Sequence, residues 1–348
     1  VLEEYIPGRI RTNDSKVTYS LVGPDTEDRS DVDTKNPLRG ALVVGGSSSD
    51  DVAAKLRQIG QDAQAGRAPA AEPPAQADLR AEVRVAIDFG DADDLVSKID
   101  RALAALDGDN DAAWQLLANQ GVFRGSGSTG QLAFLYTGQG SQYVNMLDTL
   151  RHSEPIVAAT FAEADAVMTP ILGKPLSDYI FIDSDDPAAV TASEFDLMQT
   201  EITQPAVLTV DIALTRLLAA YGIEPDMVMG HSLGEYGALV AAGSLQFDEA
   251  LMAVAGRGRE MAPVAVEDRG LMAAVSAPWA TIEETVDAVD GYVVIANVNS
   301  TSQAVIGGAT APVETAMAQL SEAGYQVIQL PVSHAFHTEI VAPASGPL

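Results

Sequence analysis

The chain has 348 residues, of which 20 are Lys or Arg and 49 are Asp or Glu, so its formal net charge at pH 7 is −29. So large a negative charge argues against nucleic acid and anionic membranes as partners. The absence of cysteine excludes disulfides and thiolate chemistry, and only four histidines argue against a multi-histidine metal site. No signal peptide and no run of about 18 apolar residues is present, so we expect a cytoplasmic protein.

The negative charge is concentrated in the second part of the chain. Residues 1–128 contain 14 basic and 22 acidic side chains, whereas residues 129–348 contain 6 basic and 27 acidic ones, a net charge of −21. Because so few basic residues remain in this second part, an Arg in one of its pockets becomes a candidate for binding an anion.

The first part of the chain is expected to hold a connector and a small domain. Residues 1–36 are polar, with little periodicity, and predict an irregular connector. Residues 37–127 predict a small α/β linker domain, because apolar strand patterns and amphipathic helix patterns alternate there. Its predicted elements are a strand at 40–45, a helix at 52–64, a strand at 82–89 and a helix at 91–106. Residues 125–130, which contain three glycines, predict a flexible boundary.

A second, larger α/β domain is expected over residues 130–348. Its predicted elements are strands at 132–136 and 226–230, a helix at 205–221 headed by Pro205, and helices at 233–242 and 247–261. Residues 265–333 then predict strands and helices in the order β-α-β-β-α-β, which is typical of a ferredoxin-like subdomain.

Gly230-His231-Ser232-Leu233-Gly234 is the strongest functional motif in the sequence. It reads G-x-S-x-G between a short apolar strand and a helix, which is the context of a nucleophile elbow. The elbow exposes the Ser232 hydroxyl, and the N-terminus of the helix that follows favours developing negative charge. We therefore predict that Ser232 is a nucleophile.

A serine nucleophile needs a base within hydrogen-bond reach. His231 is adjacent in the chain, but neighbouring side chains at such a turn point apart. His334 and His337, which follow the last predicted strand of the ferredoxin-like subdomain, are the remaining candidates. No residue stands out as a third, acidic member, so a Ser–His dyad oriented by a backbone carbonyl stays open.

Two further segments carry weaker signals. Arg257 could hold a carboxylate through its planar guanidinium, but from the residues alone a surface ion pair with Glu249 or Glu260 is the favoured interpretation. The loop from Gly138 to Gln142 follows a predicted strand, and its glycines would let backbone amides approach an oxyanion.

Taken together, these motifs resemble the malonyl-CoA:acyl carrier protein transacylase family, and most of all the acyltransferase domains of type I polyketide synthases. The resemblance covers residues 130–348, and it implies an α/β-hydrolase-like large subdomain with the ferredoxin-like insertion. Residues 37–127 are similar to the linker between ketosynthase and acyltransferase, and residues 1–36 to the exit from the ketosynthase. The matching segments are Gly138-Gln139-Gly140-Ser141-Gln142, Gly230-His231-Ser232-Leu233-Gly234-Glu235, Arg257-Gly258-Arg259, Asn297-Val298-Asn299 and Ser333-His334-Ala335-Phe336-His337.

The resemblance implies a role for each matching position. Ser232 would carry the acyl group, His337 would be the base, and the amides of Gln139 and Leu233 would form the oxyanion hole. Arg257 would bind the malonyl carboxylate, which reverses the ion-pair reading of that residue. His231, His334 and Phe336 would belong to the pocket, with the Phe336 ring favouring malonyl over methylmalonyl groups by about 1–3 kcal/mol.

The partners implied are an acyl carrier protein and a ketosynthase of the same polypeptide. No cofactor or metal is implied; malonyl-CoA and the carrier's phosphopantetheine take part as substrates. Thr137 departs from the family, which usually has proline there, and we expect a C-terminal segment after Leu348 to be missing. The alternatives left open are a serine hydrolase or editing thioesterase with the same dyad, and an inactive docking scaffold.

Overall fold

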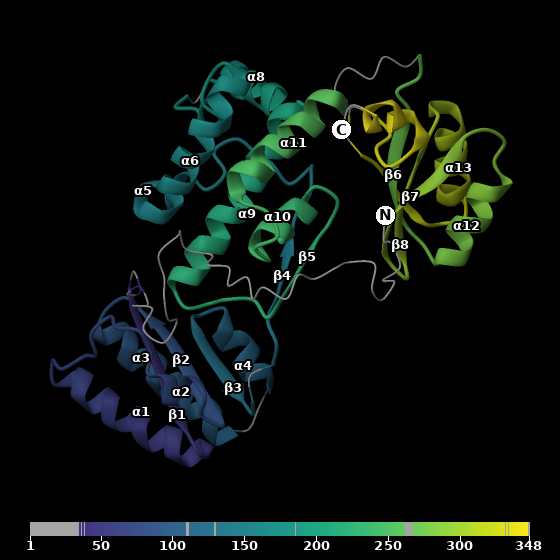
Figure 1. Cartoon of the computed structure of the whole chain (residues 1–348). Helices are drawn as coiled ribbons and strands as arrows, with labels where there is room; N and C mark the ends of the chain where they lie inside the picture. Colours follow the sequence, from purple (N-terminus) through teal and green to yellow (C-terminus); the bar gives the residue numbers. More distant parts are fainter. Residues whose placement is uncertain are drawn as a thin grey trace, which may run out of the picture. The chain divides into compact units, whose positions relative to one another are not determined.

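A computed structural model describes residues 35, 37, 39–108, 111–128, 130–184, 186–261, 267–330, 332 and 334–346. These residues form two compact units, which are described separately (Figure 1). One unit contains residues 35–134 and 216–227, and the other contains residues 135–215 and 228–346. Apart from Lys35, the expected connector at 1–36 lies outside the described residues. The division into linker and acyltransferase domains stays a prediction.

The first unit contains a three-stranded antiparallel sheet in the order β1-β2-β3. Alternate residues of β2 are buried, with Val85, Ile87 and Phe89 facing a core that also contains Leu56 and Leu95. α1 and α3 lie side by side in Figure 1 and supply the helical side of this core. The elements are β1 (Gly40–Gly46), α1 (Ser49–Gln64), α2 (Gln76–Leu79), β2 (Val83–Phe89), α3 (Ala92–Gly108), α4 (Asp111–Ala118) and β3 (Val122–Ser126).

The predicted flexible boundary at residues 125–130 is wrong at its start. Gly125 and Ser126 belong to β3 and pair with Arg84 and Val83 of β2. Val122, the first residue of β3, is fully buried and anchors this edge of the sheet to the core. The pairing partner lies about forty positions away in the chain, so the local Gly/Ser pattern gave no sign of the strand.

β4 and β5 pair in a two-stranded sheet with helices around it, and both strands end within the second unit. The amides of Asp226 and His231 donate to the carbonyls of Leu132 and Tyr136, so the register advances in the same direction along both strands. The strands are therefore parallel, as expected of an α/β core. The elements are β4 (Ala133–Tyr136), α5 (Asp148–Ser153), α6 (Pro155–Leu172), α7 (Ser177–Ile180), α8 (Pro187–Leu197), α9 (Thr200–Ala220), β5 (Met227–Gly230), α10 (Gly234–Ala241) and α11 (Phe247–Met261).

α9 begins five residues before the predicted start at Pro205. Proline is favoured in the first turn of a helix, which is why it suggested the start. Here Pro205 lies inside α9, and the segment 202–209 around it is buried throughout. Burial of these side chains holds the extra turn in place although proline has no amide to donate.

α6 and α9 are long and apolar enough to cross a membrane by length and composition alone. In α9, 78% of the most apolar 18-residue stretch is buried within the protein, as in a core helix. For α6 the share is 28%, and its buried residues, among them Val157, Phe161 and Met168, lie on the side that packs against α11. The packing of α9 accounts for its apolar composition.

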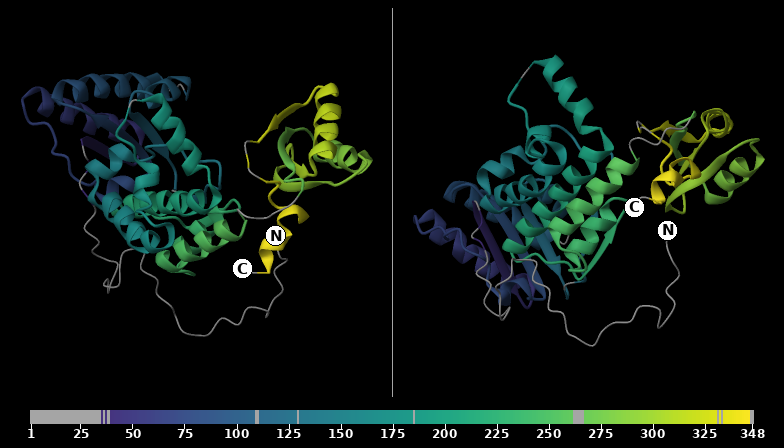
Figure 2. Two further views of the ribbon diagram at one scale, coloured as in Figure 1. Left: turned by 90° about the horizontal axis from the view of Figure 1, so that it is seen from above. Right: turned by 45° about the horizontal axis from the view of Figure 1, so that its top comes forward.

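The remainder of the second unit is the ferredoxin-like subdomain. Its sheet has the order β7-β8-β6-β9, and every paired neighbour is antiparallel. Figure 2 shows α12 and α13 covering one face of this sheet, where they enclose a core built around Ile282, Val313 and Leu320. The predicted order β-α-β-β-α-β is confirmed. The elements are β6 (Leu271–Ser276), α12 (Trp279–Ala288), β7 (Val293–Ser300), β8 (Gln303–Gly308), α13 (Thr310–Glu322), β9 (Gln326–Gln329) and the 3-10 helix η2 (Glu339–Ser345).

Candidate active site

The G-x-S-x-G segment forms a sharp turn between β5 and α10. Ser232 lies at its apex with φ of 54°, a left-handed conformation that is uncommon for a residue with a side chain. A Cβ on Gly230 would collide with the backbone of Gly234 and Glu235, and one on Gly234 would collide with the carbonyl of Tyr136. Both glycines are therefore required by close backbone approach, and they hold Ser232 in the strained geometry of an elbow.

The structure brings His337, rather than His334 or His231, to the Ser232 hydroxyl. The Ser232 Oγ lies 2.8 Å from His337 Nε2, a hydrogen bond between residues 105 positions apart in the chain. His337 also has a left-handed backbone, with φ of 59°. Two strained residues thus face one another, which is typical of a site where surrounding structure fixes reactive groups.

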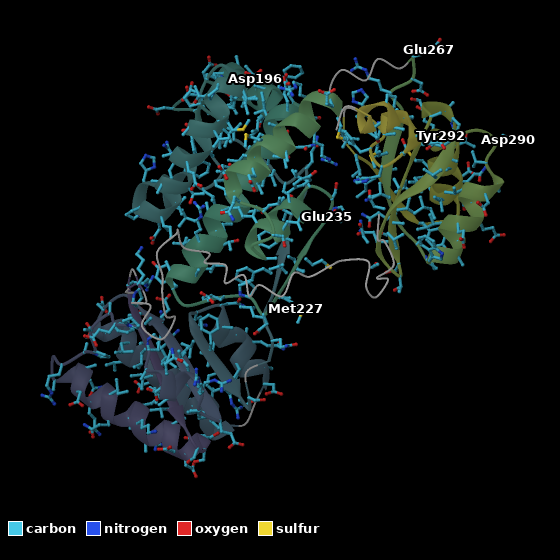
Figure 3. The ribbon with its side chains drawn as sticks, in the orientation of Figure 1. Asp196, Met227, Glu235, Glu267, Asp290 and Tyr292 are labelled. Carbon is cyan, nitrogen blue, oxygen red and sulfur yellow. The ribbon has the colours of Figure 1, made fainter. Side chains whose placement is uncertain are left out.

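The surroundings of His337 favour its neutral form. Although the side chain stays accessible to solvent, the protein atoms around it reduce its hydration, and this lowers the pKa of the imidazole. The positive charge of Arg257 lowers the pKa further, while Glu235, on α10 next to the elbow (Figure 3), acts weakly in the opposite direction. A neutral imidazole beside a hydroxyl can accept its proton, as a general base must.

Two backbone amides next to the elbow are available to an oxyanion. Leu233 directly precedes α10, and Gln139 lies in the loop after β4; neither amide has a hydrogen-bond acceptor in the described part of the chain. A Cβ on Gly138 would lie 2.7 Å from the carbonyl of His231, so glycine lets this loop approach the elbow closely. The predicted pair of donors is thus present on two neighbouring backbone segments.

Arg257 does not form the surface ion pair that its sequence context allowed. It is partly buried on α11, and no ion pair or hydrogen bond reaches its guanidinium from the residues the structure describes. Burial lowers its pKa, an effect that Tyr236 and Glu235 oppose. Arg259, two residues later, is exposed and pairs with Glu260 at 3.8 Å. The two arginines of this motif therefore differ in their surroundings, and Arg257 is the one without an ion pair among the described residues.

Gly258 explains how Arg257 is positioned. A Cβ at this glycine would lie 2.6 Å from the Glu201 Cα and 2.7 Å from the Thr200 carbonyl oxygen, both in the first turn of α9. α11 therefore packs directly on the start of α9. The side-chain amide nitrogen of Gln139, Nε2, lies 3.5 Å from the Thr200 hydroxyl, so the same turn also contacts the loop after β4.

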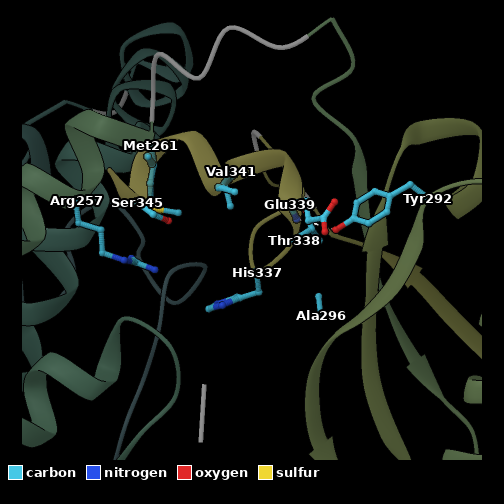
Figure 4. A pocket seen from close by; sticks show the side chains of 11 residues that line it. Arg257, Met261, Tyr292, Ala296, His337, Thr338, Glu339, Val341 and Ser345 are labelled. Carbon is cyan, nitrogen blue, oxygen red and sulfur yellow. Dashed lines mark hydrogen bonds between the residues drawn. The ribbon is translucent and has the colours of Figure 1, made fainter. Parts of the chain in front are cut away.

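Arg257 and His337 line one pocket of about 630 Å³, in the size range of ligand sites. Figure 4 shows the two side chains pointing toward one another across it. Tyr292 and Ala296 lie at the ferredoxin-like side, and the Tyr292 hydroxyl accepts a 2.7 Å hydrogen bond from the Glu339 amide. The full lining is Arg257, Met261, Tyr292, Ala296, His337, Thr338, Glu339, Val341, Ala342, Ala344 and Ser345.

The other predicted pocket residues lie differently. His334 and Phe336 are buried and are not among the residues that line this pocket; Phe336 packs in a cluster with Met261, which does line it. A role of Phe336 in specificity would therefore act through Met261. His231 is held by Asn299 on β7, whose Oδ1 lies 3.1 Å from the His231 Nε2. The roles of His231, His334 and Phe336 stay predictions.

Sequence reasoning did not identify Tyr292 or Asn299 as site residues. Asn299 belonged to a matching motif but was given no role, and no local pattern distinguishes Tyr292. Among the described residues no group of three or more His, Asp or Glu side chains could hold a metal ion. The functional groups that the structure brings together at this site are a serine hydroxyl, an imidazole, two backbone amides and a guanidinium.

Comparisons with known proteins agree with this geometry. The family model for the acyl transferase domain matches residues 133–348. The malonyl CoA-acyl carrier protein transacylase of Escherichia coli strain K12 is 40% identical over 223 residues, which are 63% of this chain and 68% of that protein. The spectinabilin polyketide synthase system protein NorB of Streptomyces orinoci is 36% identical over 218 residues, or 63% of this chain.

Among solved structures, the acyltransferase domain from the second module of the salinomycin polyketide synthase matches with a TM-score of 0.61 and 29% identity. The match covers 86% of this chain and 66% of that one. This chain spans about a tenth of the length of the Streptomyces orinoci protein. The family match covers more than half of the chain and includes the elbow, the His337 segment and Arg257. The chain therefore belongs to the acyl transferase domain family.

Proposed function

We propose that this chain transfers a malonyl group from CoA to the phosphopantetheine thiol of an acyl carrier protein, in polyketide or related fatty acid synthesis. The observation that carries the proposal is the 2.8 Å contact of Ser232 with His337, because His337 lines a pocket together with Arg257, which has no ion pair among the described residues. A hydrolase of neutral esters has no need for a partly buried cation there. The name of the Escherichia coli relative supports the choice of malonyl and carrier protein, and the name of the Streptomyces relative supports polyketide synthesis.

In the first half-reaction the malonyl carboxylate would bind Arg257, and the Ser232 oxygen would attack the thioester carbonyl carbon. The Ser232 proton passes to His337 Nε2 as the C–O bond forms. The amides of Gln139 and Leu233 stabilise the oxyanion. The tetrahedral intermediate then loses CoA as its thiol, which takes the proton from His337, and leaves a malonyl ester on Ser232.

The second half-reaction repeats these steps with the carrier's thiol as the nucleophile. His337 takes the thiol proton, the sulfur attacks the ester carbonyl, and the Ser232 oxygen leaves and regains a proton. The result is a ping-pong reaction without a cofactor of its own. We also propose a ketosynthase in the same polypeptide, since the Streptomyces relative is a polyketide synthase system protein far longer than this chain. The cytoplasmic location expected from the sequence is part of the proposal.

The test is to mix the chain with malonyl-CoA and to map any adduct by intact-mass and peptide mass spectrometry. We expect one malonyl group on Ser232, none in Ser232→Ala, and a normal adduct in Ser244→Ala, which changes an exposed serine after α10. Addition of a phosphopantetheinylated carrier protein should then move the malonyl group to the carrier.

The outcomes separate the alternatives. Release of the malonyl group to water at the same rate with and without the carrier would identify a hydrolase or editing thioesterase. Absence of any adduct would identify a docking scaffold and refute the proposal. Competing acyl-CoAs in the same mixture report the acyl preference directly.

A further inference from the structure

Asp211 is a partly buried carboxylate on α9 that the proposed reaction does not use. Its Oδ2 atom is enclosed and has no hydrogen-bond donor among the described residues. Its Oδ1 atom lies 3.5 Å from the Thr137 hydroxyl. The Thr137 backbone amide is close enough to lower the pKa of the carboxyl. Within the described chain, no Lys, Arg or His lies within ion-pair distance of it. An enclosed carboxylate with so few partners is costly, so its surroundings bear on function.

Thr137 links this carboxylate to the active site. It lies between Tyr136, the last residue of β4, and the Gly138-Gln139 segment that offers an amide to the oxyanion. A Cβ on Gly237 of α10 would lie 3.2 Å from Asp211 Oδ2, so the carboxylate also touches the helix that follows the elbow. Asp211 thus lies where α9, the end of β4 and α10 meet, next to Thr137 and Gly237.

We propose that Asp211 is a positioning residue that holds Thr137 and thereby fixes the Gln139 amide for oxyanion binding. The inference rests on the proposed acyl transfer and adds a side chain to it. The Asp211 carboxylate does not touch the reacting atoms; it faces the hydroxyl and the amide of Thr137 at the root of the loop. Thr137→Pro would remove both donors at once, whereas Thr137→Val would remove only the hydroxyl.

The ionisation of Asp211 supplies a readout that a purely structural residue would not move. Burial raises the pKa of Asp211 to about 7, which the contacts from Thr137 oppose. The other titratable group facing it is Tyr136, whose hydroxyl bonds Thr215 at 2.9 Å and whose own pKa is raised by burial. The ionised carboxylate accepts both Thr137 donors best, so loop positioning should improve as pH rises through about 7.

The experiment measures kcat and KM for malonyl transfer from malonyl-CoA to the carrier protein across pH, together with the melting temperature. For Asp211→Asn we expect kcat to fall roughly tenfold with KM nearly unchanged, because oxyanion contacts act in the transition state. The rate step near neutral pH should vanish, and the melting temperature at alkaline pH should rise. Thr137→Val should show a smaller loss of kcat and keep the step, and Asp183→Asn, an exposed control, should match the parent.

Two results would overturn the inference: an Asp211→Asn profile that matches the parent at every pH, or a loss of kcat accompanied by a lower melting temperature. A fluorophosphonate probe separates this failure from failure of the proposed function. Its Ser232 adduct forms with loss of fluoride and places a P–O oxygen in the same hole without any malonyl group. If the parent reacts with the probe but not with malonyl-CoA, the proposed function is wrong. The effect of Asp211→Asn on the probe rate then decides the positioning role.

Discussion

Replacement of Arg257 by alanine is the sharpest test of substrate selection. Arg257 is partly buried, lines the pocket with His337 and has no acidic partner among the residues described. A malonyl carboxylate would supply that partner, and an acetyl group would not. We therefore expect Arg257→Ala to weaken transfer of malonyl groups selectively.

The size of the effect follows from the kind of contact. A hydrogen bond to a charged group contributes about 1.5–3 kcal/mol, and about 1.4 kcal/mol corresponds to a factor of ten. The specificity constant for malonyl-CoA should thus fall roughly 10- to 150-fold. Acetyl-CoA makes no such contact, so its rate should change by less than about threefold. The rate rises if the uncharged acetyl methyl group no longer has to bind next to an unpaired cation.

The assay is the rate of acyl-Ser232 formation in single turnover with each thioester, read by mass spectrometry. Arg259→Ala is the matched control, because Arg259 lies two residues away on α11, is exposed and pairs with Glu260. Arg257→Lys should fall between the parent and alanine, since lysine keeps the charge without the planar fork. If malonyl and acetyl rates fall by the same factor in Arg257→Ala, the carboxylate assignment is wrong.

Two further predictions concern the base and the elbow. The pKa of His337 is lowered from 6.5 by burial and by Arg257, so in an Asp211→Asn background acylation should lose rate only below about pH 6.5. Arg257→Ala should move that acid limb upward, and an unmoved limb in a titration of acetyl transfer would contradict the assignment. Gly234→Ala would push a methyl group into the Tyr136 carbonyl and should abolish acylation or folding. Gly256→Ala on α11, where no atom lies within 4 Å of the added Cβ, should keep full activity and a circular dichroism melt at or above the parent's.

The elbow and the ferredoxin-like insertion were predictable because their signals are local. A short apolar strand, two glycines around Ser232 and a helix are contiguous, and each glycine is required by atoms within a few positions or in the adjacent strand. The alternation of strand and helix patterns in 265–333 likewise needed no distant partner. The sheet order β7-β8-β6-β9 follows from pairing between segments and was left unassigned.

What the sequence did not reveal depends on long-range contacts. The choice between His334 and His337 came from a resemblance, and the 2.8 Å contact with Ser232 spans 105 positions. Asp211 meets Thr137 across 74 positions, in a helix whose composition gives no hint of a site. The burial of Phe336 in a cluster with Met261, outside the pocket lining, was equally unpredictable, because a side chain's distance from a pocket depends on packing rather than on pattern.

Burial of the Asp211 carboxylate lowers folding stability, and a cost of this kind is typical of residues near an active site. Burial raises its pKa from 3.8 to about 7, and each unit corresponds to about 1.36 kcal/mol. As pH rises, the Asp211 carboxyl loses its proton at a lower pH in the unfolded chain than in the folded chain. Folding stability therefore falls between about pH 4 and about pH 7, by about 4 kcal/mol in all. That loss is a large share of a typical 5–15 kcal/mol.

A loss of this size is expected only where the charge does something that a neutral side chain cannot, and Asp211 supports the loop that would bind the oxyanion. Urea unfolding of the parent and of Asp211→Asn distinguishes this from simple tolerance. The variant should gain stability over the parent at about pH 8 but little at about pH 5, because the parent's carboxyl is then largely protonated. An equal difference at both pH values would mean that the buried group does not titrate with the fold. The stability cost would then have to be sought in packing alone.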